Sequence, residues 1–231
     1  MPPAFVGLNK MVKRNWTRKV ERTSDGSSTF FIPEWNERYH SQHGAVQESM
    51  HVFLEMGLKE FQSHAELNVF EMGFGTGLNA LLTYLNKNSE QNIFYHSLEA
   101  YPLQEEEIKA LANTYGEDGE VLKDFLVQEF EKEKKYSNFT LLKTKAFLQD
   151  FDLKKESVDL VYYDAFGPRV QPELWELDCF LKMYSGLKPK GCLVTYCAKG
   201  QVRRNMVEAG FQVEKLPGPP GKREMLRAWK P

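Results

Sequence analysis

The sequence predicts an α/β fold in which helices cover both faces of a mostly parallel sheet, preceded by an extension made of a β-hairpin and a helix. Two observations carry this prediction. From residue 67 onward, short apolar runs typical of buried strands alternate with amphipathic helical patterns. The first of these strands runs into a glycine-rich turn and then a helix, which is the usual start of a parallel βαβ unit. The 231 residues have room for one such domain and an elaboration.

The extension is placed at residues 1–60. Its expected elements are a hairpin at 16–32, irregular chain at 33–41 and a helix at 45–58. The hairpin is expected because Asp25-Gly26 is a strong turn signal between two runs with strand character. The helix is expected because apolar residues recur there on one helical face.

The main domain is placed at residues 61–231. Its expected strands are 67–72, 92–99, 139–143, 158–164, 192–196, 211–216 and 225–229. Its expected helices are 78–86, 104–113, 119–133, 146–151, 173–186 and 200–209. In a sheet of this kind, ligands bind at the carboxyl ends of the strands, near the point where the strand order reverses.

The composition is that of a soluble globular protein, with 42% hydrophobic and 27% charged residues. No apolar run is long enough for a membrane span, and the first residues lack the pattern of a signal peptide, so we expect a cytoplasmic protein without a membrane partner. The three cysteines form no C-x-x-C pair and share no ligand spacing with the five histidines. We therefore expect no metal site.

The formal net charge of −2 conceals an uneven distribution along the chain. Eleven acids stand against three lysines at 99–133, whereas eleven Lys and Arg stand against three glutamates from residue 182 onward. A second basic group near the N-terminus consists of Lys10, Lys13, Arg14, Arg18, Lys19 and Arg22. This distribution is compatible with a face that binds a polyanion, and equally with a solvated surface.

The glycine-rich turn reads Val-Phe-Glu-Met-Gly-Phe-Gly-Thr-Gly-Leu-Asn over residues 69–79. Its glycines, Gly73, Gly75 and Gly77, allow backbone N–H groups to approach a ligand closely at the start of a helix. A dinucleotide fingerprint requires G-x-G-x-x-G, which this turn does not match. The E-x-G-x-G-x-G spacing instead resembles motif I of S-adenosylmethionine (SAM)-dependent methyltransferases. By itself the turn also permits a connection that binds no ligand.

Acids at strand ends extend this interpretation. Glu99 closes the second strand, where a carboxylate can accept both ribose hydroxyls of an adenosine. Glu71 precedes the glycines, and the motif resemblance implies that it contacts the amino group of the methionine moiety of SAM. At the third strand such enzymes carry an acid that contacts adenine, but Lys145 stands in the matching stretch and is left without a role.

A second motif, Tyr-Tyr-Asp-Ala-Phe-Gly-Pro, ends the fourth strand at 162–168. It resembles motif IV of methyltransferases that act on amino groups. Asp164 is the expected catalytic residue, because its carboxylate can orient an acceptor amine and take its proton. Phe166 and Trp175 are candidates for contact with the substrate, although ordinary core packing explains either ring equally well.

Three separated motifs from residue 23 onward together resemble the methyltransferase domain of the MnmC family, in the stand-alone form called MnmD. They are the glycine turn, the Asp164 motif with Pro-Glu-Leu-Trp, and the tail from Val202 to Leu226. The resemblance implies a class I, Rossmann-like fold, SAM bound with the help of Asn79, and N-methylation of 5-aminomethyl-(2-thio)uridine at the tRNA wobble position. It further implies contact with the anticodon region, for which the candidate residues are Tyr39, Arg203, Arg204, Lys222 and Arg223.

The chain stops at Pro231 without a second nucleotide-binding turn, so we expect no FAD-dependent oxidase domain. Three alternatives stay open: a SAM-dependent methyltransferase for another amine, a non-catalytic RNA-binding protein with a vestigial cofactor site, and, least favoured, a nicotinamide dehydrogenase. The sequence does not determine the oligomeric state, and a monomer is compatible with it.

Overall fold

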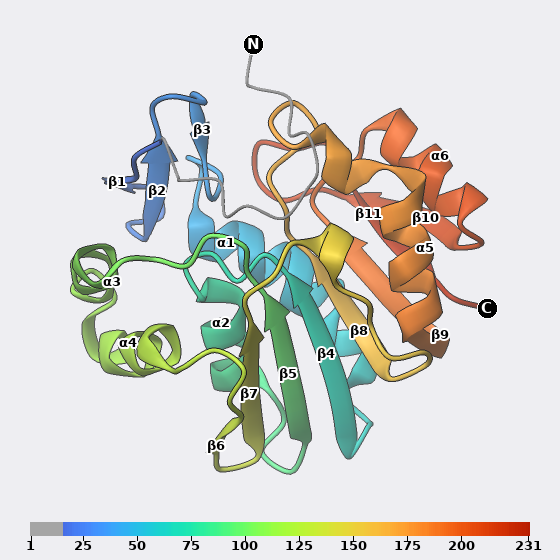
Figure 1. The fold of residues 1–231 in the computed structure, drawn as a ribbon, viewed down its shortest axis with the longest axis horizontal. Coiled ribbons are helices and arrows are strands. Elements are labelled where there is room, and N and C mark those ends of the chain that lie inside the picture. Colours follow the sequence, from blue (N-terminus) through green and yellow to red (C-terminus); the bar gives the residue numbers. More distant parts are fainter. Residues whose placement is uncertain (1–15) are drawn as a thin grey trace.

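The computed structural model describes residues 16–231, which form two sheets and the helices around the larger one (Figure 1). The strands of the larger sheet, in chain order, are β4 (Glu66–Met72), β5 (Asn92–Leu98), β6 (Lys134–Tyr136), β7 (Phe139–Thr144), β8 (Val158–Tyr163), β9 (Leu187–Thr195), β10 (Gln212–Pro217) and β11 (Glu224–Trp229). Their spatial order is β10-β11-β9-β8-β4-β5-β7-β6. The five strands from β9 to β7 pair in parallel, and β11 runs antiparallel between β9 and β10.

Helices cover both faces of this sheet, as the alternating pattern predicted (Figure 1). They are α2 (Leu78–Asn86), α3 (Glu105–Ala112), α4 (Gly119–Val127), α5 (Leu177–Gly186) and α6 (Gly200–Glu208). Side chains of α2, α3 and α4 form one buried apolar cluster with the sheet, and those of α5 and α6 form the other. In β4, Val69 belongs to the first cluster and Phe70 to the second, because successive side chains of a strand point to opposite faces.

One predicted helix end is wrong, and one strand was not predicted. The helix expected at 119–133 ends at Val127, because the ammonium of Lys143 donates to the carbonyls of Phe125 and Leu126 and satisfies the end of α4. The chain beyond it forms β6, a short polar edge strand that carries too little hydrophobic pattern to be predicted.

The expected helix at 45–58 is only partly α-helical. The structure has α1 (Ala45–Ser49), which continues as a π-helical segment (Met50–Glu55) and is followed by a 3₁₀ turn (Leu58–Phe61). The helix expected at 173–186 likewise begins as a 3₁₀ turn (Pro172–Trp175) before α5. The segment at 45–58 keeps its predicted apolar face against the core, and only its hydrogen-bond pattern differs.

The N-terminal extension contains the predicted hairpin, β1 (Lys19–Arg22) and β2 (Ser28–Ile32), with a further strand β3 (Glu37–Arg38) in the stretch expected to be irregular. Its turn caps the next helix, since the Asp25 carboxylate accepts the N–H of Gln47 at 3.0 Å. The resulting three-stranded sheet lies over the carboxyl-terminal edge of the large sheet (Figure 1). Over residues 16–231, no helix is long and apolar enough to cross a membrane.

Candidate active site

The glycine-rich turn connects β4 to α2 and adopts a conformation that requires glycine. Gly73, Gly75 and Gly77 have φ angles of 95°, 51° and 74°, a region that other residues rarely adopt. A Cβ added at Gly73 would stand 2.9 Å from the backbone carbonyl oxygen of Asp164. The turn therefore packs directly against the chain that leaves β8, and brings the two predicted motifs together.

Glu71 is fully buried beneath this turn. Its carboxylate accepts hydrogen bonds from Ser97 Oγ at 2.7 Å and from Asn79 Nδ2 at 3.0 Å. Burial and the nearby Asp164 carboxylate together raise the pKa of Glu71 to about 8, against the lowering effect of these hydrogen bonds. A cation beside this carboxyl would favour its charged form.

Asp164 follows β8 and is half-buried. Its Oδ2 accepts a hydrogen bond from Asn79 Nδ2 at 2.8 Å, so one amide group joins the carboxylates of Glu71 and Asp164. Burial raises the pKa of Asp164 to about 8; the Asn79 hydrogen bond opposes this, and the Glu48 carboxylate adds to it. Two acids with raised pKa values thus meet at one amide.

Asn79 itself has spare hydrogen-bonding capacity. Its side chain is 3% exposed, and its Oδ1 has no hydrogen-bond partner among the described residues. Buried polar atoms in proteins nearly always have a partner, so this oxygen fits a site that receives a donor from a ligand.

The raised pKa of Glu71 predicts a pH-dependent stability. Between its ordinary pKa and about 8, the folded protein holds a proton on Glu71 that the unfolded chain releases, so the free energy of unfolding falls as the pH rises. Glu71→Gln, which keeps the shape and the acceptor for Asn79, should therefore raise the melting temperature by a few degrees at pH 9 and change it little at pH 5. Calorimetry of the ligand-free protein at both pH values checks this. A variant that melts below the wild type at pH 9 would contradict it.

Glu99 lies at the end of β5, beside the glycine turn. Its carboxylate accepts the backbone N–H of Gly75 at 2.7 Å and that of Tyr101 at 2.6 Å. Glu99, which the sequence places about twenty residues after the glycines, therefore contacts the glycine turn directly.

Glu99→Ala should weaken SAM binding by about 1 to 3 kcal/mol, the scale of hydrogen bonds to a charged acceptor. Isothermal titration calorimetry with SAM measures the effect. Glu66→Ala, which removes an exposed acid at the opposite end of β4, is the matched control. An unchanged SAM affinity in a folded Glu99→Ala protein would assign the ribose contact to another residue.

The predicted aromatic residues differ in position. Tyr39 and Phe166 are both half-buried, and their rings make an edge-to-face contact with centroids 4.9 Å apart. Trp175 is only 3% exposed, and its indole N–H donates to the Phe166 carbonyl at 2.8 Å. The indole thus holds the Phe166 segment from within the core, and the substrate contact predicted for Trp175 stays a prediction.

The predicted basic residues also separate into two groups. Arg203, Arg204 and Arg223 are exposed. Lys222 forms an ion pair with the buried carboxylate of Glu48, and its ammonium lies 3.9 Å from the centre of the Tyr196 ring. The Lys222 side chain keeps 34% of its surface exposed, and the phosphate contact predicted for it stays a prediction.

Sequence reasoning missed several polar residues of the site. The extension supplies His40, whose Nε2 lies 3.4 Å from Thr76 Oγ1 in the glycine turn, and burial lowers the pKa of His40 to about 4. It also supplies Glu48, which accepts the N–H of Ser41 at 2.8 Å. These roles do not follow from local sequence spacing, because His40 meets Thr76 across 36 positions and Glu48 pairs with Lys222 across 174 positions.

The third strand, where the expected acid is absent, receives one from elsewhere. The Glu131 carboxylate accepts the backbone N–H of Lys145 at 2.8 Å and the hydroxyl of Thr144 at 3.1 Å. Lys145 itself is exposed. An acid thus stands at the end of β7 although the strand's own sequence lacks it.

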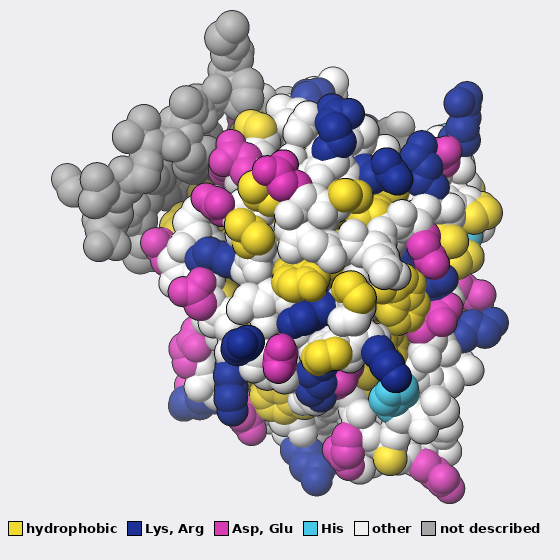
Figure 2. Space-filling model, turned by 90° about the vertical axis from the view of Figure 1, so that its right-hand side faces the viewer, with side chains coloured by type: hydrophobic (Ala, Val, Ile, Leu, Met, Phe, Trp, Pro, Cys, Tyr) yellow, Lys and Arg dark blue, Asp and Glu magenta, His cyan; other side chains and the backbone are white. Residues whose placement is uncertain are grey.

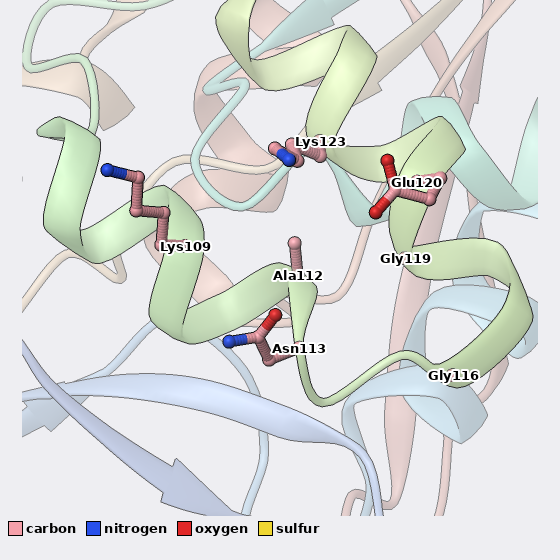
Figure 3. A pocket seen from close by; sticks show the side chains of 7 residues that line it. All are labelled: Lys109, Ala112, Asn113, Gly116, Gly119, Glu120 and Lys123. Atoms are coloured by element: carbon pink, nitrogen blue, oxygen red, sulfur yellow. The ribbon is translucent and has the colours of Figure 1, made fainter.

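A separate pocket lies between α3 and α4 (Figure 3). It is lined by Lys109, Ala112, Asn113, Gly116, Gly119, Glu120 and Lys123. None of these residues belongs to the site around Asp164.

Within residues 16–231, no group of three or more His, Cys, Asp or Glu side chains is arranged to hold a metal ion.

The parallel sheet with its reversed last strand, the glycine turn and the acids at the ends of β4, β5 and β8 define a class I methyltransferase fold. The chain belongs to a family described as S-adenosyl-L-methionine-dependent methyltransferase, whose model matches residues 103–231. The positive-φ cradle and the spare acceptor of Asn79 fit such a ligand.

Similar proteins support this assignment. The chain is 26% identical to the tRNA 5-methylaminomethyl-2-thiouridine biosynthesis bifunctional protein MnmC of Acidovorax sp., over 92% of this chain and 36% of that protein. It is 29% identical to the MnmC protein of Leptospira interrogans, over 84% of this chain and 32% of that protein. It thus spans about a third of the length of these relatives.

Solved structures agree with the fold. The crystal structure of MNMC2 from Aquifex aeolicus matches with a TM-score of 0.78 and 25% identity, over 94% of this chain and 72% of that one. Spermidine synthase from Thermotoga maritima matches with a TM-score of 0.58 and 12% identity, over 93% of this chain and 69% of that one, which is a likeness of fold alone.

Proposed function

We propose that this protein transfers a methyl group from SAM to the amino group of 5-aminomethyl-(2-thio)uridine at the wobble position of tRNA. The observation that carries the proposal is the Asn79 amide, which joins Glu71 on the cofactor side to Asp164 on the acceptor side. One nitrogen, Asn79 Nδ2, donates to both carboxylates, so the acid proposed for the cofactor and the acid proposed for the acceptor share one amide group. The printed names of the MnmC relatives support the choice of a tRNA aminomethyluridine as substrate.

The ends of two strands, β4 and β5, would hold the cofactor. Glu71 would face the amino group of its methionine moiety, the backbone of Gly73, Gly75 and Gly77 would lie along it, and Glu99 would accept its ribose hydroxyls. When bound, SAM supplies an electrophilic methyl group. The ring of Tyr39, which lies over Gly75, excludes water from this side of the site.

Asp164 prepares the acceptor. An alkylamine is mostly protonated at neutral pH and must lose one proton before it can attack. Asp164 Oδ accepts that proton, and its pKa of about 8 suits a base that works near pH 7. The same carboxylate orients the neutral amine by accepting a hydrogen bond from it. Phe166, two residues further on, is placed to face the cation that forms on methylation.

The RNA backbone meets a basic surface. Arg203 and Arg204 are exposed on α6, and Arg223 is exposed in the loop before β11. Figure 2 shows Lys and Arg side chains gathered along the upper part of the face that carries α5 and α6. Exposed guanidinium groups of this kind bind phosphates without reading sequence. Of the N-terminal basic group, Lys10, Lys13 and Arg14 lie outside the described residues.

The decisive experiment is methyl transfer from labelled SAM to bulk tRNA from a strain that lacks this activity, followed by mass analysis of the nucleosides. We expect label in 5-methylaminomethyl-(2-thio)uridine and none in tRNA that lacks the aminomethyl group. Label in small amines or proteins but not in tRNA would favour another amine substrate. SAM binding without any transfer would favour a non-catalytic RNA-binding protein.

A further inference from the structure

The N-terminal extension lies directly on the two loops assigned to the cofactor. The Tyr39 ring stands 3.1 Å from the position of a Cβ at Gly75, and His40 lies within 3.4 Å of Thr76. Arg18 reaches the loop that follows Glu99, where it donates to the carbonyls of Tyr101 and Pro102. The extension is therefore one wall of the proposed cofactor site.

Arg18 is the centre of this contact. Its side chain has an exposed fraction of 0%. Its Nη1 forms an ion pair with Glu107 at 2.9 Å, and its Nε donates to the Tyr39 hydroxyl at 2.6 Å. The guanidinium also lies 4.8 Å from the centre of the Trp16 ring. A planar fork with several fixed donors makes such an arrangement possible, and a lysine ammonium cannot reproduce it.

We infer that Arg18 is a positioning residue for SAM binding. Tyr101 is held at both ends, because its N–H donates to Glu99 and its carbonyl accepts from Arg18. The position of the Glu99 carboxylate thus depends on Arg18, as does the Tyr39 ring above Gly75. This inference rests on the SAM site of the proposed function but does not depend on tRNA as the substrate.

The Arg18 guanidinium is buried and does not belong to a basic surface. The sequence placed it in a basic group compatible with a polyanion, but a fully buried guanidinium cannot contact a phosphate backbone. Among the described residues, its four hydrogen bonds go to Tyr39, to the carbonyls of Tyr101 and Pro102 in the loop after β5, and to Glu107 in the first turn of α3. Its effect is therefore directed at the cofactor loops.

The test is the equilibrium Kd for SAM without RNA, with circular dichroism and melting of the ligand-free protein as controls for folding. Arg18→Met should raise the Kd at least about tenfold, because it releases both the loop after Glu99 and the Tyr39 ring. Arg18→Lys should recover only part of this loss, because it keeps the charge beside Glu107 without the fork. Arg38→Met, which removes an arginine paired with Glu21 in the same small sheet, should leave the Kd within about twofold.

A folded Arg18→Met protein with the wild-type Kd would overturn the inference, as would an equal loss in Arg38→Met. If Arg18→Met does not fold, Tyr39→Phe decides, because it keeps the ring and removes the hydroxyl that accepts from Arg18 Nε. Its Kd should rise about threefold or more, and a wild-type Kd would overturn the inference. In a folded variant that binds SAM more weakly, the KM for SAM should rise by a larger factor than the kcat falls. Failure of tRNA methylation in the wild type would leave these binding results intact.

Discussion

Asp164→Ala should lower methyl transfer to aminomethyluridine tRNA by at least about a hundredfold, the scale of one positioned acid–base group. The reason is that Asp164, which accepts a hydrogen bond from Asn79 and whose pKa burial raises to about 8, is the proposed base for the acceptor amine. SAM affinity should fall modestly at most. Initial rates with saturating tRNA and SAM, together with the Kd for SAM, measure both effects. Asp150→Ala, which removes an exposed acid, is the control and should have wild-type turnover.

Asp164→Asn separates orientation from proton transfer, because an amide oxygen accepts a hydrogen bond but the amide takes no proton. Substantial activity in the Asn variant with none in the Ala variant would assign orientation to Asp164. Loss in both would assign charge or proton transfer. Near wild-type turnover in the Ala variant would remove Asp164 from the mechanism.

Gly75→Val should abolish SAM binding while the protein stays folded. Gly75 has φ of 51°, which is unfavourable for a β-branched residue, and the new Cβ would press on the Tyr39 ring at 3.1 Å. The side chain would also occupy the space along which the methionine moiety lies. Calorimetric titration with SAM and with NAD measures the result, and we expect NAD to bind neither protein, since the glycine spacing is not that of a dinucleotide site.

Gly116→Val is the matched control for the backbone strain. Gly116 has a similar φ of 56°, but a Cβ there meets nothing within 4 Å. It should cost stability and leave SAM affinity unchanged. Equal losses of affinity in the two variants, or NAD binding by the wild type in place of SAM, would refute the assignment of the glycine turn.

Local patterns explain why much of the fold was predictable. The strands β4 and β8 are largely buried on both faces and read as short apolar runs, whereas β5 alternates buried and half-buried residues. Each of the three ends at an acid or a glycine turn. The failures lie where the pattern is weak or overridden. The strand β6 is polar, and α4 is ended by the ammonium of Lys143, which comes from a strand that follows it in the chain.

The candidate site divides in the same way. Motif patterns placed the candidate residues at the ends of β4, β5 and β8, whereas the partners of Trp175 and Lys222 do not follow from such patterns. Trp175 packs against Tyr163 of β8 and Phe180 of α5, and Lys222 pairs with Glu48 across 174 positions of the chain. Sequence spacing carries no information on such a pair.

The sequence by itself determined the βαβ alternation, the glycine turn and the acids at the strand ends, because these depend on hydrophobic period and on backbone conformations that only glycine adopts readily. Only the tertiary structure decided that Asn79 joins Glu71 to Asp164 and that Arg18 is buried against the loop after Glu99. These contacts join segments that are distant in the chain. Only the packing of the fold determines which side chains come into contact and which charged groups are buried.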